Sequence, residues 1–436
     1  MVEPEIAIDS EEIFYLHRVK DGEELFFLVN PTDGAVDAQI TLCGRFAPEL
    51  WDLENGGITP LHLYTVDEKQ TTFAMHFEPY GSALISAAPY TGQPHLEEAN
   101  FTVLSFDGKN VRGCGGPQEK RAVAVCDGER QVCTMSVPGA AQTLALPAQW
   151  AFETDKPNCI LTDAYKMRYV EPGEGADAAR EICAPDYDFA GWYDFKMGAW
   201  EMQLPMERDE NTYPVDLWYA ARFAADYVPA DAVLLVDGFA GSGWQLYVNG
   251  ACVDGPFTRS WLDAEIRQVP VGALLRRGEN TVAVKLTVTK KSDGMLDLLK
   301  ITGNFCVELH GGKPVITAPG HQLPLGDWTQ LGYPYYSGAG VYTGAFTLPP
   351  QAGECRVTLT GEVGADILEA SANGGALQKR LWRPYAVDLT QQVHPGENSL
   401  RVRCVNTLVN LLEGKTQASG VRRLQLQAQP VFTMEF

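Results

Sequence analysis

Short segments of alternating apolar and polar residues dominate the chain. Residues 12–19 (EIFYLHRV), 24–31 (ELFFLVNP) and 71–77 (TTFAMHF) are examples, and Gly-, Asn- and Pro-rich turns close such segments. A period of two over roughly five to eight residues is typical of β-strands with one buried face. Only residues 175–184 and 294–300 show even a weak helical pattern. The pattern therefore predicts an all-β protein.

Length and composition narrow the class of protein further. A chain of 436 residues is too long for one ordinary hydrophobic core, so several domains are expected. The 42 glycines and 27 prolines favour turn-rich sandwiches over helical bundles. The formal net charge of −22 repels nucleic acid and anionic membranes, and we expect neither as a partner. No apolar run reaches the length of about 18 residues that a membrane span needs.

Two parts of the chain share one motif. Residues 246–255 (LYVNGACVDG) and 369–378 (EASANGGALQ) each contain Asn-Gly, and each is followed by Gly-Glu-Asn at the start of another alternating strand, at residues 278–280 and 396–398. Asn-Gly and isolated glycines supply the positive φ angles of tight turns. Two copies of one motif predict two β-sandwich modules in tandem.

The turn pattern divides the chain into consecutive units. Residues 1–146 are expected to form an N-terminal β-sandwich, in which 91–146 is a candidate small β satellite. Residues 147–308 and 309–436 are expected to be the two modules that share the repeated motif.

These motifs resemble a known family of proteins. The segment 246–255 followed by 272–287 (GALLRRGENTVAVKLT) resembles the sugar-binding jelly roll of glycoside hydrolase family 2, a galactose-binding-like β-sandwich. The third unit is similar to it through 336–349 (YSGAGVYTGAFTLP) and 394–406 (HPGENSLRVRCVN). Segment 13–33 (IFYLHRVKDGEELFFLVNPTD) is similar to the β-sandwich that follows the barrel in family 106, rhamnosidase-like enzymes.

The resemblance implies a run of accessory β-domains belonging to a large glycoside hydrolase. The partners it implies are carbohydrate and the catalytic domain of the parent chain. No succession of strands with intervening 10–15-residue helices occurs in this sequence, so the catalytic (β/α)₈ barrel is expected to precede residue 1. Two alternatives remain open, namely a free-standing carbohydrate-binding protein and a glycosidase that acts on its own.

Glycoside hydrolysis needs two carboxyl groups, one of which has a raised pKa. The densest acidic group near aromatic residues lies in residues 206–218 and comprises Glu207, Asp209, Glu210 and Asp216. A solvated loop explains this group better than catalysis does. The catalytic residues therefore stay unassigned.

Sugar binding uses aromatic rings that stack on a pyranose, together with nearby polar groups. The candidate residues lie in loop-like segments or follow a turn, and packing between domains is the competing explanation for each. They are Trp192, Trp200, Arg259, Trp261, Asp263, Trp382, Arg383 and Tyr335.

The tyrosine-rich segment 332–350 combines a loop with a strand. Alternation places Tyr342 and Phe346 on one face, where we expect them in a core. Tyr333, Tyr335 and Tyr336 precede the strand and are expected to be free to meet a ligand or a neighbouring domain.

The ten cysteines are scattered, with no CxxC pair and no zinc-ligand spacing. This usage predicts a reducing, cytoplasmic location, and the acidic N-terminal segment has no signal-peptide pattern. No cofactor motif is present. The fold family would accommodate a structural calcium, but no Asp-rich loop identifies a site for one.

Overall fold

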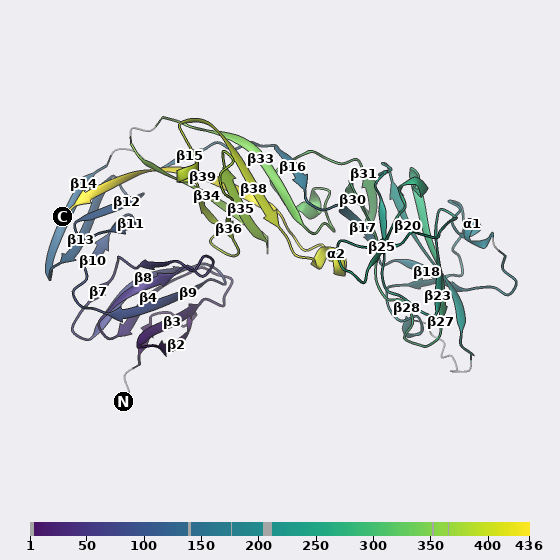
Figure 1. The fold of residues 1–436 in the computed structure, drawn as a ribbon, viewed down its shortest axis with the longest axis horizontal. Coiled ribbons are helices and arrows are strands. Elements are labelled where there is room, and N and C mark those ends of the chain that lie inside the picture. Colours follow the sequence, from purple (N-terminus) through teal and green to yellow (C-terminus); the bar gives the residue numbers. More distant parts are fainter. Residues whose placement is uncertain (1–3, 138–140, 176, 204–211, 351–352, 365) are drawn as a thin grey trace.

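The structure is a computed structural model that describes residues 4–137, 141–175, 177–203, 212–350, 353–364 and 366–436. These residues form an elongated row of β-sandwich modules (Figure 1). The prediction of an all-β protein with several sandwich modules is confirmed. None of the helices in these ranges has the length and hydrophobicity needed to cross a lipid bilayer.

The N-terminal sandwich packs two antiparallel sheets around one core. The strands of the first sheet are, in order, β1 (Ile6–Ile8), β4 (Val36–Cys43), β8 (Gln70–Phe77) and β7 (Thr65–Val66). Those of the second are β2 (Phe14–Lys20), β3 (Glu23–Val29), β9 (Ser82–Pro89), β5 (Phe46–Trp51) and β6 (Ile58–Pro60). Alternate residues such as Phe26, Leu28 and Ile40 fill the space between the sheets.

A small satellite follows and is completed by the end of the chain. One sheet contains β10 (His95–Ala99), β13 (Glu119–Cys126) and β14 (Glu129–Ser136). Opposite it, β11 (Thr102–Phe106) and β12 (Asn110–Cys114) continue onto the last strand, β39 (Val421–Glu435). Phe432 and Met434 of β39 belong to the satellite core, so this core is built from both ends of the sequence.

Two further modules follow, and one is inserted into the sequence of the other. We call the one that receives the insertion the outer module, and it consists of residues 142–154 and 322–430. One of its sheets contains β32 (Gln322–Leu323), β16 (Trp150–Thr154), β33 (Ala339–Leu348), β38 (Gly396–Val405), β35 (Ile367–Ala372) and β36 (Gln378–Arg380). The other contains β15 (Gln142–Leu144), β39, β34 (Cys355–Val363) and β37 (Ala386–Asp388). Its short helices are η4 (Trp328–Gln330), η5 (Thr390–Gln392) and α2 (Val409–Glu413).

The inner module consists of residues 158–317. One sheet contains β17 (Asn158–Thr162), β29 (Leu299–Gly303), β21 (Val233–Val236), β26 (Arg267–Pro270) and β25 (Thr258–Arg259). The second contains β19 (Tyr193–Phe195), β18 (Tyr165–Tyr169), β20 (Val215–Ala225), β27 (Gly278–Val288), β23 (Gly243–Val248) and β24 (Ala251–Val253). Smaller elements are β22 (Phe239–Ala240), β28 (Gly294–Met295), β30 (Cys306–His310), β31 (Lys313–Thr317), α1 (Ala178–Ile182), η1 (Glu201–Gln203) and η3 (Gly272–Leu274).

The inner module is inserted into the outer one. β16 lies in the predicted range 147–308, yet it pairs with β33, where Phe152 lies opposite Tyr342. β15 lies in the predicted range 1–146, yet it pairs with β39. The sheets therefore cross the consecutive ranges expected from the sequence, because the chain leaves the outer module after β16 and returns only at β32.

The two modules repeat one strand order. In the inner module β18, β20, β27 and β23 are successive neighbours, and in the outer module β16, β33, β38 and β35 are. The registers also agree, because Val248 lies opposite Val282 and Ala372 lies opposite Leu400. Val282 and Leu400 each lie four residues after the glycine of the Gly-Glu-Asn motif in their module. The shared motif therefore corresponds to one architecture used twice.

The tyrosine-rich segment is packed rather than free. Tyr342 and Phe346 lie in the outer core, as predicted. Tyr333, Tyr335 and Tyr336 are also buried, so they are not freely exposed as expected, although Tyr333 and Tyr335 each line a cavity. Tyr335 does meet a neighbouring module, because it packs with Leu161 and Leu298 at the contact between inner and outer modules. Sequence alternation could not reveal a contact that the insertion creates.

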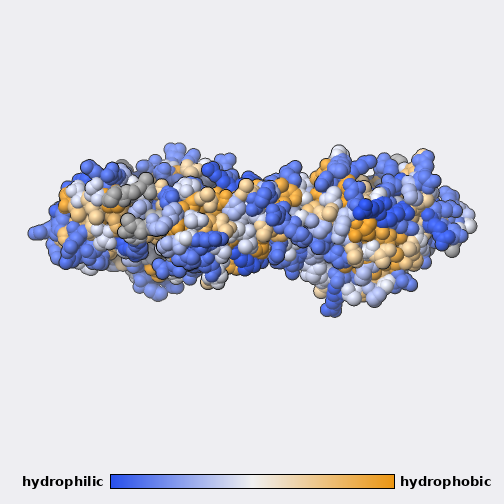
Figure 2. All heavy atoms as spheres, turned by 90° about the horizontal axis from the view of Figure 1, so that it is seen from above, coloured by the Kyte–Doolittle hydropathy of each residue, from blue (hydrophilic) through white to orange (hydrophobic). Residues whose placement is uncertain are grey.

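Surface hydropathy differs along the molecule. Figure 2 shows hydrophobic residues gathered most densely over the end formed by the inner module, whereas much of the remaining visible face is hydrophilic.

Candidate functional site

A cavity of about 690 Å³ lies where the chain crosses from the outer to the inner module. Its walls come from the end of β16, the linker 155–157, the strands β21, β26 and β29, and the loops that contain Trp261 and His321. Its buried part includes Phe152, Phe305 and Tyr333. This volume is within the range typical of small-ligand sites. We call this space the crossover cavity.

Hydrogen bonds hold the linker beside the cavity in place. Asp155 Oδ1 accepts hydrogen bonds from the Ala339 backbone N–H at 2.7 Å and from the Tyr336 hydroxyl at 3.1 Å. Asn158 Nδ2 donates to the carbonyl oxygens of Phe305 and Gly332, both at 2.9 Å. The linker therefore joins the two modules through polar contacts on both sides of the cavity.

Trp261 presents an aromatic ring at the mouth of the cavity. Its side chain is 37% exposed and belongs to the loop that precedes β26. Lys156 Nζ lies 5.4 Å from the centroid of the indole ring, a cation–π contact that restrains the ring. A partly exposed and restrained indole is suited to stacking on the apolar face of a sugar.

Polar side chains around the cavity are available for a ligand. Gln268, Asn304 and His321 line it, and their side chains make no hydrogen bond to another residue in the part of the chain that the structure describes. Asp231 Oδ2 accepts a hydrogen bond from the Asn304 backbone N–H at 3.0 Å, which fixes the turn after β29. Amide and imidazole groups can donate to and accept from hydroxyls, as sugar recognition requires.

Arg259 and Asp263 are the predicted polar neighbours of Trp261. Arg259 ends β25 and Asp263 lies on the loop that carries Trp261, but neither lines the cavity. Both are exposed. Asp263 Oδ1 accepts from the Glu265 backbone N–H at 2.8 Å, and its carbonyl oxygen accepts from the Ser260 hydroxyl at 2.9 Å. The contacts of Asp263 therefore shape the loop that carries Trp261.

Trp192 and Trp200 have different surroundings. Trp200 is fully buried in the inner core, and its indole N–H donates to the Lys290 carbonyl oxygen at 3.2 Å. A sugar cannot reach this ring in the folded module, so we remove it from the candidate site. Trp192 is half-buried beside α1, with the Arg168 guanidinium 5.0 Å from its ring centroid.

The remaining candidates do not join Trp261. Tyr335 is buried between the modules. Arg383 lines a separate cavity of about 370 Å³ between the N-terminal sandwich and the outer module, and Trp382 beside it is exposed. Glu54 of the N-terminal sandwich accepts hydrogen bonds from Arg380 and from the Leu381 backbone N–H. The 380–383 loop is thus part of a contact between modules.

The acidic group at residues 206–218 is only partly described. Glu207, Asp209 and Glu210 lie outside the described residues. Asp216 is exposed on β20 and accepts a hydrogen bond from the Thr287 hydroxyl at 2.6 Å. Nothing in the described part of the chain supports a catalytic role for Asp216.

Asp237 and Asp297 form a carboxyl pair in the inner module. Burial, followed by the charge of Asp297, raises the pKa of Asp237. Raised pKa values are a feature of catalytic acids. However, Asp297 forms an ion pair with the buried Lys300, and neither carboxyl group lines the crossover cavity. The arrangement is that of a structural charge cluster.

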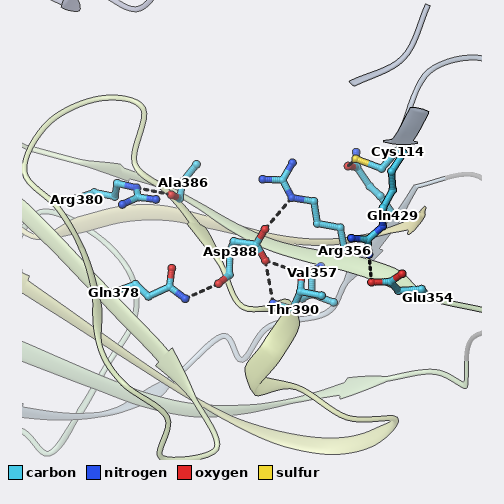
Figure 3. Close-up of polar contacts among 11 residues, drawn as sticks. Cys114, Glu354, Arg356, Val357, Gln378, Arg380, Ala386, Asp388, Thr390 and Gln429 are labelled. Atoms are coloured by element: carbon cyan, nitrogen blue, oxygen red, sulfur yellow. Dashed lines mark hydrogen bonds and ion pairs between the residues drawn. The ribbon is translucent and has the colours of Figure 1, made fainter. Parts of the chain in front are cut away.

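The polar network in Figure 3 also has a structural role. Asp388 accepts a 2.9 Å hydrogen bond from Arg356 and further bonds from the Thr390 hydroxyl and backbone N–H. Thr390 in turn accepts from the Val357 backbone N–H at 2.9 Å. Burial raises the pKa of Asp388, but the bonds from Thr390 and Arg356 outweigh this effect and hold it below its usual value. These contacts tie η5 to β34.

Acidic and metal-binding side chains are scattered over the part of the chain that the structure describes. No cluster of three or more His, Cys, Asp or Glu side chains suited to an ion occurs there. The structural calcium that the fold family would accommodate stays a prediction.

Several residues that line the cavity could not be predicted from the sequence. Asp155 and Lys156 lie in the linker between the modules, and only the insertion brings them beside Trp261. Asn304 belongs to the inner module itself, where the pairing of β29 with β21 and of β21 with β26 places it near Trp261. The loop after the Asn-Gly hairpin was the one useful signal, because it identified Trp261. Pairing of β16 with β33 has no short-range signature.

Comparisons with known proteins leave the family open. No protein-family profile matches the chain, and no curated protein is similar to it. A solved rhamnosidase from Novosphingobium sp. PP1Y matches with 14% identity and a TM-score of 0.22, over 69% of this chain and 25% of that chain. The exo-chitosanase CsxA of Amycolatopsis orientalis matches with 12% identity and a TM-score of 0.27, over 64% of this chain and 29% of that one.

The beta-glucuronidase 2 of Bacteroides uniformis matches with 15% identity and a TM-score of 0.26, over 58% of this chain and 28% of that one. The chain thus spans less than a third of each of these structures. TM-scores at this level establish neither a family nor an activity.

Proposed function

We propose that the chain is a non-catalytic, carbohydrate-binding accessory region of a glycoside hydrolase, and that the crossover cavity is its sugar site. The carrying observation is the restrained, 37% exposed ring of Trp261 at the mouth of the cavity. The Gln268 and Asn304 side chains line the same cavity and have no hydrogen-bond partner among the residues that the structure describes. Support also comes from the galactose-binding-like motifs, which coincide with the two modules of identical strand order.

In this proposal the cavity binds a neutral mono- or disaccharide. The pyranose stacks on Trp261, and its hydroxyls bond to the side chains of Gln268 and Asn304. The N-terminal sandwich and the outer module support the catalytic domain of the parent chain. The cytoplasmic location belongs to the proposal and stays a prediction.

Calorimetric titration tests the sugar site. Sugars are first selected on a glycan array, and affinity is then measured for the parent protein and for Trp261→Ala. We expect the dissociation constant to rise by about tenfold or more, because a stacking platform is lost. Trp244→Ala is a matched control, because Trp244 is 36% exposed on the same module and does not line the cavity. Equal affinities of the parent and Trp261→Ala would refute the assignment.

Two alternatives make different predictions. A free-standing carbohydrate-binding protein would have no barrel encoded in frame upstream of residue 1, which the genomic sequence decides. A glycosidase acting on its own would turn over nitrophenyl glycosides. Turnover by the 436-residue chain that an Asp→Asn substitution abolishes would refute the non-catalytic role.

A further inference from the structure

A row of apolar side chains crosses the outer face of the N-terminal sandwich. The second sheet contributes one residue from each of its five strands, and each pair of neighbours in the row is directly opposite in register. In order across the sheet, the row consists of Leu16, Phe27, Leu84, Trp51 and Ile58. We call these five residues the apolar row.

The apolar row points away from the core. Phe26 and Leu28 flank Phe27 along β3 and are buried between the sheets, so Phe27 lies on the opposite face. At the two ends of the row, Leu16 is 51% exposed and Ile58 is 47% exposed. The solvent face of an antiparallel sheet is normally polar. Between these ends, Phe27, Leu84 and Trp51 are half-buried. A contiguous apolar band on this face, exposed at both ends, therefore indicates an interaction surface.

The other modules leave this face uncovered. Contacts of the sandwich with the other modules include Glu54, in the turn between β5 and β6, and the main chain at His62 and Tyr64. The rings of Tyr64 and Tyr90 also contact His95. In Figure 1, β2 and β3 lie on the side of the sandwich away from the rest of the molecule.

Opposite charges lie on the same face, beside the apolar row. Arg18 and Glu49 occupy the next row across the sheet, at β2 and β5, with Leu25 and Ser86 between them. Neither residue forms an ion pair with another residue in the described ranges. Glu49 accepts only a 3.3 Å hydrogen bond from the Ser86 hydroxyl in those ranges. The face therefore carries a positive edge and a negative interior.

We propose that this face is a homodimer interface, occupied by the same face of a second copy of the chain. A two-fold axis parallel to the strands and centred on β9 superimposes the apolar row on itself. Leu84 then meets Leu84 of the partner subunit, and Phe27 meets Trp51 of the partner subunit. Isologous contacts of this kind are the commonest form of protein oligomer.

The charges favour this partner over an unrelated one. Under the same axis, Arg18 lies one strand away from Glu49 of the partner subunit. Neighbouring strands are about 4.8 Å apart, a spacing that an arginine side chain spans. Two ion pairs related by the axis therefore form beside the apolar row. Opposed sheets in a sandwich pack about 10 Å apart, which accommodates the side chains of the two rows.

Sedimentation velocity of the full chain tests the proposal across a wide range of concentrations. We expect a monomer–dimer equilibrium, and Leu16→Glu should raise the dimer dissociation constant by more than about tenfold, because a charge is placed in an apolar interface. Val19→Glu is the matched control, because Val19 is 61% exposed on the same strand but faces the other side of the sheet.

A charge exchange tests the orientation. Arg18→Glu and Glu49→Arg should each weaken the dimer, and the double variant should restore it, while circular dichroism confirms that all variants are folded. A monomer at every concentration would overturn the proposal and leave the face to a different partner. Equal weakening by Leu16→Glu and Val19→Glu would also overturn it, because that result indicates pairing through the free edge of β2.

Discussion

Asn249 Nδ2 donates a hydrogen bond to Asn280 Oδ1 at 2.9 Å. In the outer module, Asn373 Nδ2 donates to Asn398 Oδ1 at 2.8 Å. Both first asparagines have positive φ angles, of 50° and 51°, and both accept a bond from the first residue after the Gly-Glu-Asn motif. One asparagine pair therefore locks the same two turns together in each module.

Substitution of the second asparagine is expected to unfold its own module first. Asn280 is fully buried, donates to the carbonyl oxygens of Arg276 and Gly278, and accepts from the Arg276 N–H. Asn280→Ala leaves these groups unpaired and should cost about 3 kcal/mol or more. Hydrogen–deuterium exchange should then increase in β20 and β27 before it increases in the outer module.

The outer module provides the reciprocal test. Asn398→Ala should increase exchange in β33 and β38 first, because Asn398 bonds to His394 and Gly396 in the same way. Asn304→Ala is the control, since this exposed side chain has no hydrogen-bond partner in the described ranges. If either variant increases exchange equally in both modules, the proposed equivalent roles of the two asparagine pairs are contradicted.

The asparagine pairs also show what could be predicted from the sequence. Asn-Gly and Gly-Glu-Asn are local turn motifs, so the repeated architecture was recognisable before any contact was known. The insertion of one module into the other was not, because β16 pairs with β33 across the whole inner module. Trp261 was predicted from its loop. Its neighbours Lys156 and Asn304 were not, because Lys156 reaches it only through that insertion and Asn304 only through the long-range pairing of β29 with β21.

Asp366 should make the outer module less stable as the pH rises. Burial raises the pKa of this carboxyl group to about 6, although the Gly420 N–H donates to it at 2.6 Å. A raised pKa means that the folded state favours the protonated carboxyl group, so ionisation of Asp366 destabilises the folded module. This loss of stability is absent at low pH, develops above about pH 4 and is complete above about pH 6. Asp366→Asn keeps an acceptor for Gly420 and does not ionise.

Denaturant unfolding at pH 4 and pH 7 measures this difference. The free energy of unfolding of Asp366→Asn should be close to that of the parent at pH 4, and larger by on the order of 2 kcal/mol at pH 7. Asp388→Asn should behave in the opposite way, because the pKa of Asp388 is lowered and its stabilisation is lost as the pH falls. A constant difference between Asp366→Asn and the parent across this range would show that Asp366 does not titrate there.

His17 should stabilise the N-terminal sandwich at low pH. Burial lowers the pKa of His17, but hydrogen bonds and charge from Glu24 and Glu5 outweigh it, and the pKa is raised overall. The stabilisation is therefore complete below the unfolded value of about 6.5 and is lost as the pH rises through the higher folded value. The imidazole also stacks on Phe26, with ring centroids 4.5 Å apart.

Exchange of the β2–β3 peptides at two pH values checks this expectation. His17→Gln removes the titrating group, so the parent should be better protected than the variant at pH 5.5, after correction for intrinsic rates. The advantage should shrink at pH 9. His76→Gln is the control, because His76 lies on the other sheet and is exposed. An advantage that grows with pH would contradict the assigned direction of the shift.

The end of the chain should be required for the satellite to fold. Phe432 is buried in the satellite core, where its ring contacts Phe101 edge to face with centroids 5.0 Å apart. Phe432→Ala should cost about 3–5 kcal/mol, which is the usual cost of a large cavity in a core. Because the satellite core is small, we expect exchange to rise throughout β10–β14 while the inner module stays protected.

Thr433→Ala is the matched control, because Thr433 is the next residue of β39 and is exposed on the opposite face. It should leave the exchange of β10–β14 unchanged. If Phe432→Ala also leaves this exchange unchanged, the satellite folds without β39. If the outer module loosens together with the satellite, the two halves of β39 unfold as one unit, because Val421–Glu435 is a single continuous strand shared by both sheets.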